Sequence, residues 1–580
     1  MKLKNIIPGM AILSLGLTAC SDQMNHKEFK IDGEDYIQRD FDKVGKITTH
    51  IYRDLDYDHG QNYGGAMLAS ATDEAVYSHQ GNSVESFYNG SWSSTNANGN
   101  TWTTCWDAIS YCNLYLDRYT GLDFPEHKLE KDYMDQMIKY ENYQWEVRFM
   151  RAYFYFLLVR QYGDVPLITE NLNADEANSQ PRVSADDIFD FIDSECYAIK
   201  DSIIANYSGA YNSIENESGR VNNLGVLALR ARAALYHASP LFTQGKDDTA
   251  KKELWHQAAL RNKECIDECV SKRSMSLASD YSKLFGIDNW SASDAIKEII
   301  FARRVAADRA METRNFPIGM NGAEGGNCPT ENLVSAYEMT NGLPITDPES
   351  GYDPQNPYDK RDKRLAVTVA VNGEKWPNEL PADALETWLG GANSRSVTYG
   401  TPTGYYLKKY VNGAQVISGT GASTTNHTWV LFRLGQVYLD YAEALLNYAG
   451  NGYEAPDGFT LSAADAINKV RKRAGQPDLP TGLGYDEFWN RYQNERFVEL
   501  AFEGHRMHDV RRWMKAPQYF TDIKVMEITK DPVSGELTFT PVTNPSYITK
   551  RAWPGDKGYF WPIPQSEILK SGALTQNPGW

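Results

Sequence analysis

The segment "YDEFWNRYQNERFVELAFEGHRMHDVRRWMK" (485–515) combines a helical pattern with a high density of charge. The pattern predicts a long helix, and Gly504 marks the place where this helix bends. Charged groups removed from water need partners of opposite charge. We therefore expect the charges around the bend to form buried or half-buried ion pairs within a helical scaffold: Glu503, Arg506, Asp509, Arg511 and Arg512.

Several other segments also read as helices. The longest, 132–163, is apolar on nearly every side in its second half, which indicates burial all round. Gly163 ends it and Pro166 prevents its continuation. Further helices are predicted at 41–58, 101–119, 184–206, 219–239, 251–272, 428–450 and 461–475. Helix pairs stand out, but no fixed period links them, so a helical repeat is suggested without being demonstrated.

The character of the chain changes between about residues 280 and 427. Gly, Pro, Asn and Asp dominate there, and the short apolar runs "KEIIFARR" and "LAVTVAV" are typical of strands. We predict a mainly α fold in which a loop-rich subdomain with short strands, at about 280–427, is inserted into a helical scaffold at about 41–279 and 428–580.

The N-terminus has the parts of a secretory signal peptide. Lys2 and Lys4 precede an apolar run that stops at Cys20, and this run is too short for a comfortable membrane span. The junction Leu17-Thr18-Ala19-Cys20 resembles a bacterial lipobox. We expect residues 1–19 to be removed, Cys20 to be lipidated and residues 20–40 to form a tether. An ordinary signal peptide with an incidental cysteine is the alternative.

The net charge argues against several partners. Lys and Arg total 58 against 76 Asp and Glu, a formal charge of −18; removal of two lysines with residues 1–19 makes it 56 − 76 = −20. Such a surface repels nucleic acid and anionic lipid. The abundant aromatic residues, 36 Tyr and 14 Trp, suit amphipathic ligands such as sugars, although many will lie in the core.

The cysteines are too sparse for a disulfide framework. Cys265 and Cys269 share a face of a predicted helix, but no further ligands stand at metal-site spacing, so buried thiols are expected. His505 and His508 are also a poor match to a metal motif, since the sequence is not H-E-x-x-H. We predict no metal and no cofactor.

Several motifs together resemble the SusD/RagB family of nutrient-binding outer-membrane lipoproteins. The resemblance runs from the lipobox to the last residue. It is carried by "TDEAVY" (72–77), "RAYFYFLLVRQYGDVPLIT" (151–169), "LVSAYEMTNGLP" (333–344), "FRLGQVYLDYAEALLN" (432–447), "AINKVRKRAGQPDLP" (466–480), "NERFVELAFEGHRMHDVRRW" (494–513) and "WPIPQSEILKSGALTQNPGW" (561–580). One departure is His508, which stands where the family usually carries an aromatic residue.

The resemblance implies a fold and a role. The fold is a scaffold of TPR-like helix pairs with an irregular subdomain that carries ligand contacts. The role is that of a cell-surface lipoprotein of the outer membrane that captures a glycan and passes it to a SusC-like TonB-dependent transporter, over which it sits as a hinged lid. Catalysis is not part of that role.

The resemblance also suggests ligand contacts. In starch-binding relatives, the loop after "TDE" carries aromatic residues and an asparagine, which places Tyr77, His79 and Asn82 in the candidate site. His79 replaces an expected Trp, which puts the carbohydrate specificity in doubt. The segment "TRNF" adds Phe316 as a stacking platform, with Arg314 nearby. For the loop residues Trp92 and Trp290, two roles are equally expected: each either extends the binding surface or packs in the interior.

Two other functions fit the sequence. A RagB-like lid that binds peptides would share the fold and the transporter. A surface glycosidase would need two carboxylates facing each other across a cleft, and with 76 acidic residues the sequence neither supplies nor excludes such a pair.

Overall fold

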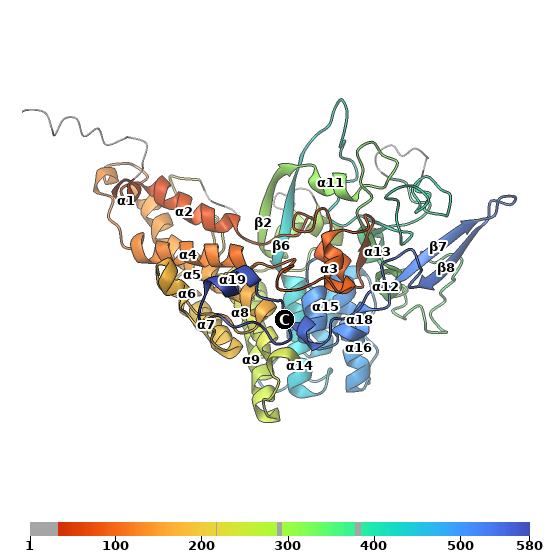
Figure 1. Ribbon diagram of the computed structural model, residues 1–580. Helices are drawn as coiled ribbons and strands as arrows, with labels where there is room; N and C mark the ends of the chain where they lie inside the picture. Colours follow the sequence, from red (N-terminus) through yellow and green to blue (C-terminus); the bar gives the residue numbers. More distant parts are fainter. Residues whose placement is uncertain (1–32, 216, 218, 287–292, 377–383) are drawn as a thin grey trace, which may run out of the picture.

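The computed structural model describes residues 33–580 except 216, 218, 287–292 and 377–383. Its long helices form a scaffold in which α4 packs on α5, α5 on α7, α7 on α8, α8 on α9, α9 on α14, and α14 on α15 (Figure 1). The bounds of the scaffold helices are α2 Phe41–Arg53, α4 Trp102–Arg118, α5 Tyr133–Tyr162, α7 Ala185–Ile199, α8 Asn223–Ala238, α9 Asp248–Asp267, α14 Leu434–Ala449, α15 Ala463–Ala474, α16 Tyr485–Glu499 and α17 Arg506–Arg512. The fold is mainly helical, as predicted.

The loop-rich region lies between α9 and α14, two helices that pack on each other directly. Strand β2 (Ile299–Asp308) leads into it and β6 (Thr425–Arg433) leads back, paired antiparallel from Ile299↔Arg433 to Asp308↔Thr425. This ladder therefore joins the region to the scaffold. The remaining strands are β1 Ala75–Tyr77, β3 Asn327–Pro329, β4 Val369–Ala370, β5 Tyr406–Leu407, β7 Lys524–Lys530 and β8 Leu537–Thr543.

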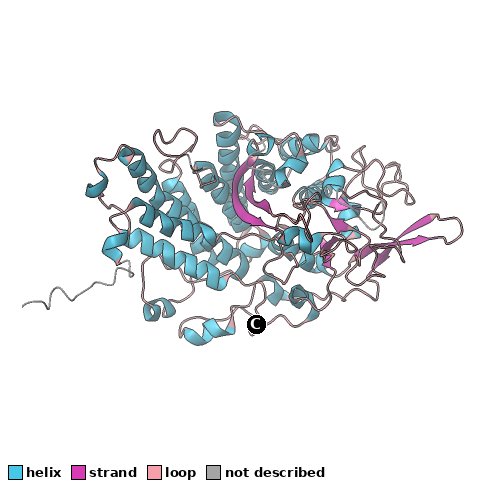
Figure 2. Cartoon of the chain, turned by 90° about the horizontal axis from the view of Figure 1, so that it is seen from above, coloured by secondary structure: helices cyan, strands magenta, loops and turns pink. Residues whose placement is uncertain are grey.

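Short helices complete the chain. They are α1 Glu34–Ile37, α3 Ser86–Asn89, α6 Ala174–Asn178, α10 Ser293–Ile296, α11 Ala310–Asn315, α12 Glu331–Ala336, α13 Lys363–Thr368, α18 Ala516–Phe520 and α19 Gln565–Lys570. Seen from above, the β2–β6 ladder runs through the middle of the body beside the long helices, and the short strands and many loops lie on the side from which the β7–β8 hairpin projects (Figure 2).

Sequence periodicity located most of the long helices, although α2 ends at Arg53 and α7 at Ile199, short of the predicted ends at 58 and 206. It also assigned two short stretches to the wrong conformation. Residues 428–433, predicted as helix, are the end of β6, because this stretch pairs with β2 in the ladder. Most of "LAVTVAV", predicted as a strand, lies in α13, and only Val369 and Ala370 form β4. At residues 428–433, pairing with β2 decided between two conformations that a short apolar run permits.

The start of α7 shows how local sequence sets a helix boundary. The Ser184 side chain accepts from the backbone N–H of Asp187, and the Asp187 carboxylate accepts from the backbone N–H of Ser184. This capping box satisfies two donors that a helix N-terminus otherwise leaves unpaired. The predicted start of this helix at residue 184 is confirmed.

The charges around the bend of the 485–515 segment lie in the interior. The helix stops at Glu499, the chain turns through Phe502 (φ +60°) and Gly504 (φ +77°), and α17 begins at Arg506. Arg433 reaches into this turn and donates to Glu298 (2.9 Å), Glu499 (2.7 Å) and Glu503 (2.8 Å). Burial opposes the charge on Glu499, but Arg473, Arg433 and Arg364 outweigh it and hold the pKa of Glu499 well below its usual range.

Arg511 is the exception among the expected ion pairs. Its guanidinium donates to the backbone oxygens of Gly558 (3.0 Å) and Met507 (3.0 Å), and it lies 4.9 Å from the ring of Trp561 and 5.1 Å from that of Trp553. Burial lowers the pKa of Arg511 to about 9. The expected ion pair is wrong at Arg511, because an aromatic cage takes the place of a carboxylate.

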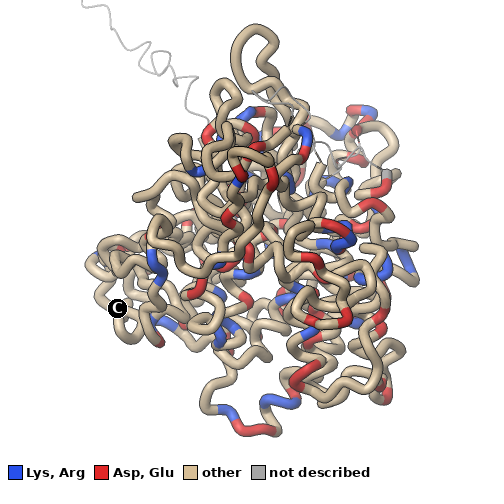
Figure 3. Tube along the Cα trace, turned by 90° about the vertical axis from the view of Figure 1, so that its right-hand side faces the viewer, with Lys and Arg blue, Asp and Glu red and all other residues tan. Residues whose placement is uncertain are grey.

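The state of the cysteines, the distribution of charge and the character of the helices were also predicted or can be checked in the structure. Cys105, Cys112, Cys196, Cys265, Cys269 and Cys328 are free and buried, which confirms the prediction of buried thiols. Acidic and basic positions are interspersed along the trace on the side shown in Figure 3. Among the described helices, none has both the length and the apolar character that a membrane span requires.

Candidate ligand-binding surface

The "TDE" motif is a structural clamp. Asp73 accepts two bonds from Arg506 (2.8 and 2.7 Å), and Glu74 accepts from the backbone N–H of Phe502 (2.9 Å). Burial opposes the charge on Arg506, but Asp73 outweighs it and raises the pKa of Arg506. Burial raises the pKa of Glu74 to about 7. These contacts join the N-terminal motif to the bend before α17 and so fix the origin of the loop that follows.

A short ladder carries that loop to the loop-rich region. Strand β1 pairs antiparallel with β3 from Ala75↔Pro329 to Tyr77↔Asn327. Beyond the ladder, Ser78 N–H donates to the Gly326 oxygen (3.0 Å) and the Ser78 hydroxyl to the Glu324 oxygen (3.3 Å). Residues 78–79 and 324–326 therefore lie side by side.

Three rings stack outward from this ladder. The ring of Tyr77 lies 5.1 Å from that of His79, and His79 lies 3.8 Å from Tyr399 with only 5° between the ring planes. The Nε2 atom of His79 is 2.6 Å from the Glu324 oxygen, which fixes the orientation of the imidazole. Tyr77 is 4% exposed whereas Tyr399 is 50% exposed. His79 covers one face of the Tyr399 ring, and the Tyr399 side chain remains half exposed.

Tyr399 was missed by sequence reasoning. It lies far along the chain from His79, in a turn with φ +63°, and no local pattern links the two. A signal exists in Gly325, also left-handed at φ +80°, because a Cβ there would lie 2.1 Å from the Tyr399 oxygen. The glycine permits the close approach of the 399 turn to the loop beside His79.

Asn82 supports the surface from below. Its Oδ1 accepts from the backbone N–H of Val84 (3.0 Å), and its Nδ2 donates to the Gly64 oxygen (3.3 Å). The Tyr77 hydroxyl donates to the same Gly64 oxygen (3.4 Å). Both ends of the Asn82 amide are thus engaged with the protein, and the residue holds the glycine-containing 59–65 loop in place.

Arg314 extends the surface. Its Nη1 donates to the His59 oxygen (2.8 Å), and its side chain lines a depression of about 450 Å³ together with Glu324, Thr313, Asp308 and Thr424. Glu324 thereby connects the depression to the ring stack, since its backbone oxygen contacts His79. A carboxylate, a guanidinium and hydroxyls beside a half-exposed aromatic ring are the groups that recognise a polyhydroxylated ligand.

Two expected platforms are interior residues. Phe316 is 0% exposed and packs edge-on against Trp376, with ring centroids 5.5 Å apart. Trp92 is 4% exposed and packs against Trp561 (5.4 Å) and Trp580 (4.8 Å). The prediction of an exposed stacking face is wrong at Phe316, because the ring is buried, and of the two alternatives left open for Trp92 the structure shows packing in the interior. Trp290 and Cys20 lie outside the described residues.

His505 and His508 were considered above as metal ligands. The carboxylates near them are paired with basic side chains. Glu503 pairs with Lys409 (2.9 Å) as well as Arg433, and Asp509 pairs with Arg496 (2.7 Å) and Arg512 (2.9 Å). In the part of the chain that the structure describes, no group of three or more His, Cys, Asp or Glu side chains is arranged to hold a metal ion.

Comparison with known proteins matches this architecture. A model described as the SusD family matches residues 297–580, and a second, described as starch-binding and associating with the outer membrane, matches residues 31–213. The chain belongs to the SusD family. Members of the family are described as binding starch or carbohydrate, and the outer-membrane location predicted from the sequence is confirmed by the family description.

Individual SusD relatives cover most of the chain. SusD-like protein P25 of Formosa agariphila is 25% identical over 429 residues, which span 71% of this chain and 69% of the relative. The starch-binding protein SusD of Bacteroides thetaiotaomicron is 23% identical over 506 residues, 81% of this chain and 76% of the relative. A solved SusD-like protein of Bacteroides fragilis, 24% identical, superposes with a TM-score of 0.73 over 94% of this chain and 98% of its own, and so has the same fold.

Proposed function

We propose that this chain is a lipid-anchored, cell-surface glycan-binding protein that captures oligosaccharide or polysaccharide and delivers it to a SusC-like TonB-dependent transporter. Capture takes place on the surface built from His79, Tyr399, Arg314 and Glu324. The protein binds its ligand and does not cleave it.

The observation that carries this proposal is the exposed ring at the end of an ordered stack. His79 holds Tyr399 parallel at 3.8 Å, so the outer ring is pre-oriented before ligand arrives. A pre-oriented ring loses little conformational entropy on binding. A sugar ring placing its C–H face on Tyr399 would bring its hydroxyl groups toward the depression that Glu324 and Arg314 line.

Affinity electrophoresis tests the choice of ligand. The mature protein is run through native gels that contain plant, microbial or host polysaccharides, with a non-binding protein as the mobility standard. Retardation by one polysaccharide class supports the proposal and names the class. If no gel retards the protein while a pull-down recovers peptides, the ligand is a peptide, as in the RagB-like alternative. Release of reducing ends from a retarding polysaccharide would make the protein a glycosidase.

The anchor and the delivery step need separate tests. Cys20→Ala should move the protein from the membrane fraction to the soluble fraction without changing its gel retardation, because the lipid attaches outside the binding body. A tagged native protein should co-purify with a TonB-dependent transporter from solubilised outer membranes. If the tagged protein were recovered without a transporter in several mild detergents, that would count against delivery to a transporter. It would not bear on glycan capture.

A further inference from the structure

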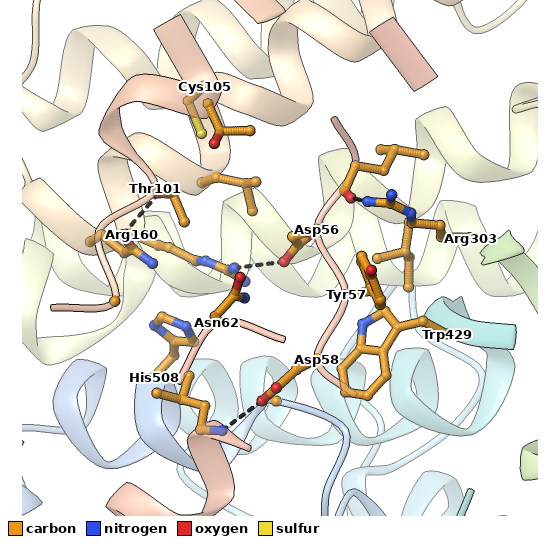
Figure 4. Close-up of a pocket in the computed structure, with 18 of the residues that line it drawn as sticks. Asp56, Tyr57, Asp58, Asn62, Thr101, Cys105, Arg160, Arg303, Trp429 and His508 are labelled. Carbon is orange, nitrogen blue, oxygen red and sulfur yellow. Dashed lines mark hydrogen bonds and ion pairs between the residues drawn. The ribbon is translucent and has the colours of Figure 1, made fainter. Parts of the chain in front are cut away.

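A cavity of about 520 Å³ between α4, α5 and β6 is lined by charged side chains that pair within the protein (Figure 4). Arg160 pairs with Asp56 (3.2 Å), and Asp58 accepts from the backbone N–H groups of Leu68 (2.6 Å) and Gly60 (3.2 Å). These contacts hold the scaffold together. A smaller cavity on another face of α4 has a different character.

This smaller cavity, the α4–α19 pocket, has a volume of about 320 Å³ and lies between α4, the 166–180 segment and α19. Its size is at the lower end of the roughly 300–1,000 Å³ of ligand pockets. Trp106, Ile168 and Leu172 are only partly buried, so apolar surface inside the pocket is accessible. The apolar lining includes Trp106, Ile109, Ile168, Leu172 and Leu574.

The rim of the α4–α19 pocket carries more acid than base. Asp107 on α4 and Glu170 in the 166–180 segment line it and are exposed. The other two charged lining residues, Glu567 and Lys570, pair with each other (2.8 Å). Among the described residues, no basic side chain forms an ion pair with Asp107 or Glu170. The pocket therefore suits an apolar side chain that positive charges flank.

The described chain begins close to this pocket. Glu34 pairs with Arg118 at the C-terminal end of α4 (3.0 Å). Arg118 contacts Asp117 (3.4 Å), and Asp117 accepts from Asn171 (3.0 Å), which lines the pocket. A continuous row of side-chain contacts thus leads from the first turn of the described chain to the α4–α19 pocket.

The sequence just before residue 33 has the chemistry that the pocket suits. It reads "KEFKID" (27–32), and it lies outside the described residues. Phe29 supplies a large apolar ring, and Lys27 and Lys30 stand on either side of it.

Phe29 is also near enough to reach the pocket. It precedes Glu34 by five residues, which an extended backbone spans in about 17 Å. Arg118, which holds Glu34, is eight residues from Ser110 on the rim, or about 12 Å along the axis of α4. The chain that enters at Glu34 is therefore long enough to place the Phe29 ring in the pocket.

We propose that residues 27–30 dock in the α4–α19 pocket of their own chain. The ring of Phe29 packs against the apolar interior, and Lys27 and Lys30 face the acidic rim. Burial of an aromatic side chain favours the docked state by roughly ten- to hundred-fold, before the cost of ordering the segment is subtracted.

Docking sets how far the body stands from the membrane. This consequence rests on the lipid anchor proposed at Cys20, whereas the docking itself does not. With residues 27–30 docked, the link between anchor and body is the seven residues 20–26 instead of the thirteen residues 20–32. The longest span of the link falls from about 45 Å to about 25 Å, and the α4–α19 face turns toward the membrane.

Cleavage by the lysine-specific protease Lys-C tests the docking. The mature protein carries Cys20→Ala so that no lipid is attached, and intact mass follows the loss of residues 20–30. Leu172→Asp places a charge in the apolar interior and should speed cleavage after Lys30 at least five-fold. Leu569→Asp is the matched control, because this leucine is 77% exposed on α19 and does not line the pocket. Its cleavage rate should equal that of the parent.

A second comparison tests which residue docks. Phe29→Asp should also speed cleavage after Lys30, but it changes the sequence that the protease reads. The decisive measurement is therefore the effect of Leu172→Asp in the Phe29→Asp background, which should disappear because the segment is already undocked. Ser110→Trp, at an exposed position of the rim, fills the pocket and should act like Leu172→Asp. It carries the test if circular dichroism shows that Leu172→Asp is misfolded.

Three results would overturn the proposal. The first is an equal cleavage rate in the parent and in the folded pocket variants. The second is an effect of Leu172→Asp that persists in the Phe29→Asp background, because the substitution would then act through general stability. The third is protection that grows with protein concentration, which would place the segment in the pocket of a second copy. Polysaccharide retardation is measured separately, so failure of the docking leaves glycan capture untouched.

Discussion

The bend before α17 and the ring stack at Tyr399 use opposite strategies to fix their side chains. At the bend, full charges are buried: Arg433 alone meets Glu298, Glu499 and Glu503 at 2.7–2.9 Å. At the stack, mostly uncharged rings pack in a row that runs from the interior to the surface. Tyr77 at the inner end is 4% exposed, and Tyr399 at the outer end is 50% exposed. The first arrangement depends on complete pairing, and the second on shape and position.

The difference separates stability from binding. Buried ions that lose a partner are strongly destabilising, so the bend tolerates few changes. The outer ring of the stack is half exposed, so we expect its removal to cost little folding energy while taking away the proposed ligand contact. The predictions below test whether the two regions can be altered independently.

Arg433→Met should have the largest effect. It leaves three buried carboxylates without their shared cation, and we expect a loss of about 3–5 kcal/mol in the free energy of unfolding, or failure to fold. Urea unfolding at pH 7 measures it. Lys128→Ala, which removes a surface pair with Asp123, is the control and should leave the midpoint unchanged. An Arg433→Met protein as stable as this control would contradict the buried network.

Phe316→Ala should cost about 3 kcal/mol, since it empties a fully buried site against Trp376. Phe316→Leu should cost less than half of that. Polysaccharide retardation of the folded Phe316→Leu protein should match the parent, because the ring contacts no solvent. If the variant were as stable as the parent but were no longer retarded by polysaccharide, Phe316 would have to be part of the binding surface.

Glu74→Gln should stabilise the protein at neutral pH. The pKa of Glu74 rises from its ordinary 4.5 to about 7 in the folded state, so the carboxyl favours folding below pH 4.5 and loses that contribution as the pH rises to 7. Glutamine keeps the acceptor for the Phe502 N–H and removes the titration, so we expect a gain of roughly 2 kcal/mol at pH 7.5 and none at pH 4. Equal effects at both pH values would refute the assignment.

The scaffold was accessible to sequence reasoning because helices and burial are encoded locally. The periodicity of 132–163 matches α5 almost to the residue, and Ser184 marks the start of α7. The charges near Gly504 also predicted burial correctly, and the expected ion pairing failed only at Arg511. Residues 428–433 failed because a strand in a buried ladder and a buried helix share the same apolar composition.

The candidate site was less accessible because it is assembled from distant loops. His79 is part of the candidate site, but Tyr399, the ring that stacks on His79, comes from a distant segment of the chain. Trp92 and Phe316 were good candidates by residue type, and only packing reveals that Trp561, Trp580 and Trp376 cover them. Residue type identifies what a ring can do, whereas exposure depends on the whole fold.

The most direct test compares two tyrosine variants in polysaccharide gels. Tyr399→Ala removes the outer ring of the stack, and Tyr197→Ala removes a ring that is 61% exposed on α7, in the helical scaffold. We predict that Tyr399→Ala weakens affinity for the retarding polysaccharide roughly ten-fold, about 1.4 kcal/mol, with an unchanged melting temperature, and that Tyr197→Ala changes neither. Parental affinity in Tyr399→Ala, or an equal loss in both variants, would contradict glycan capture at the stack.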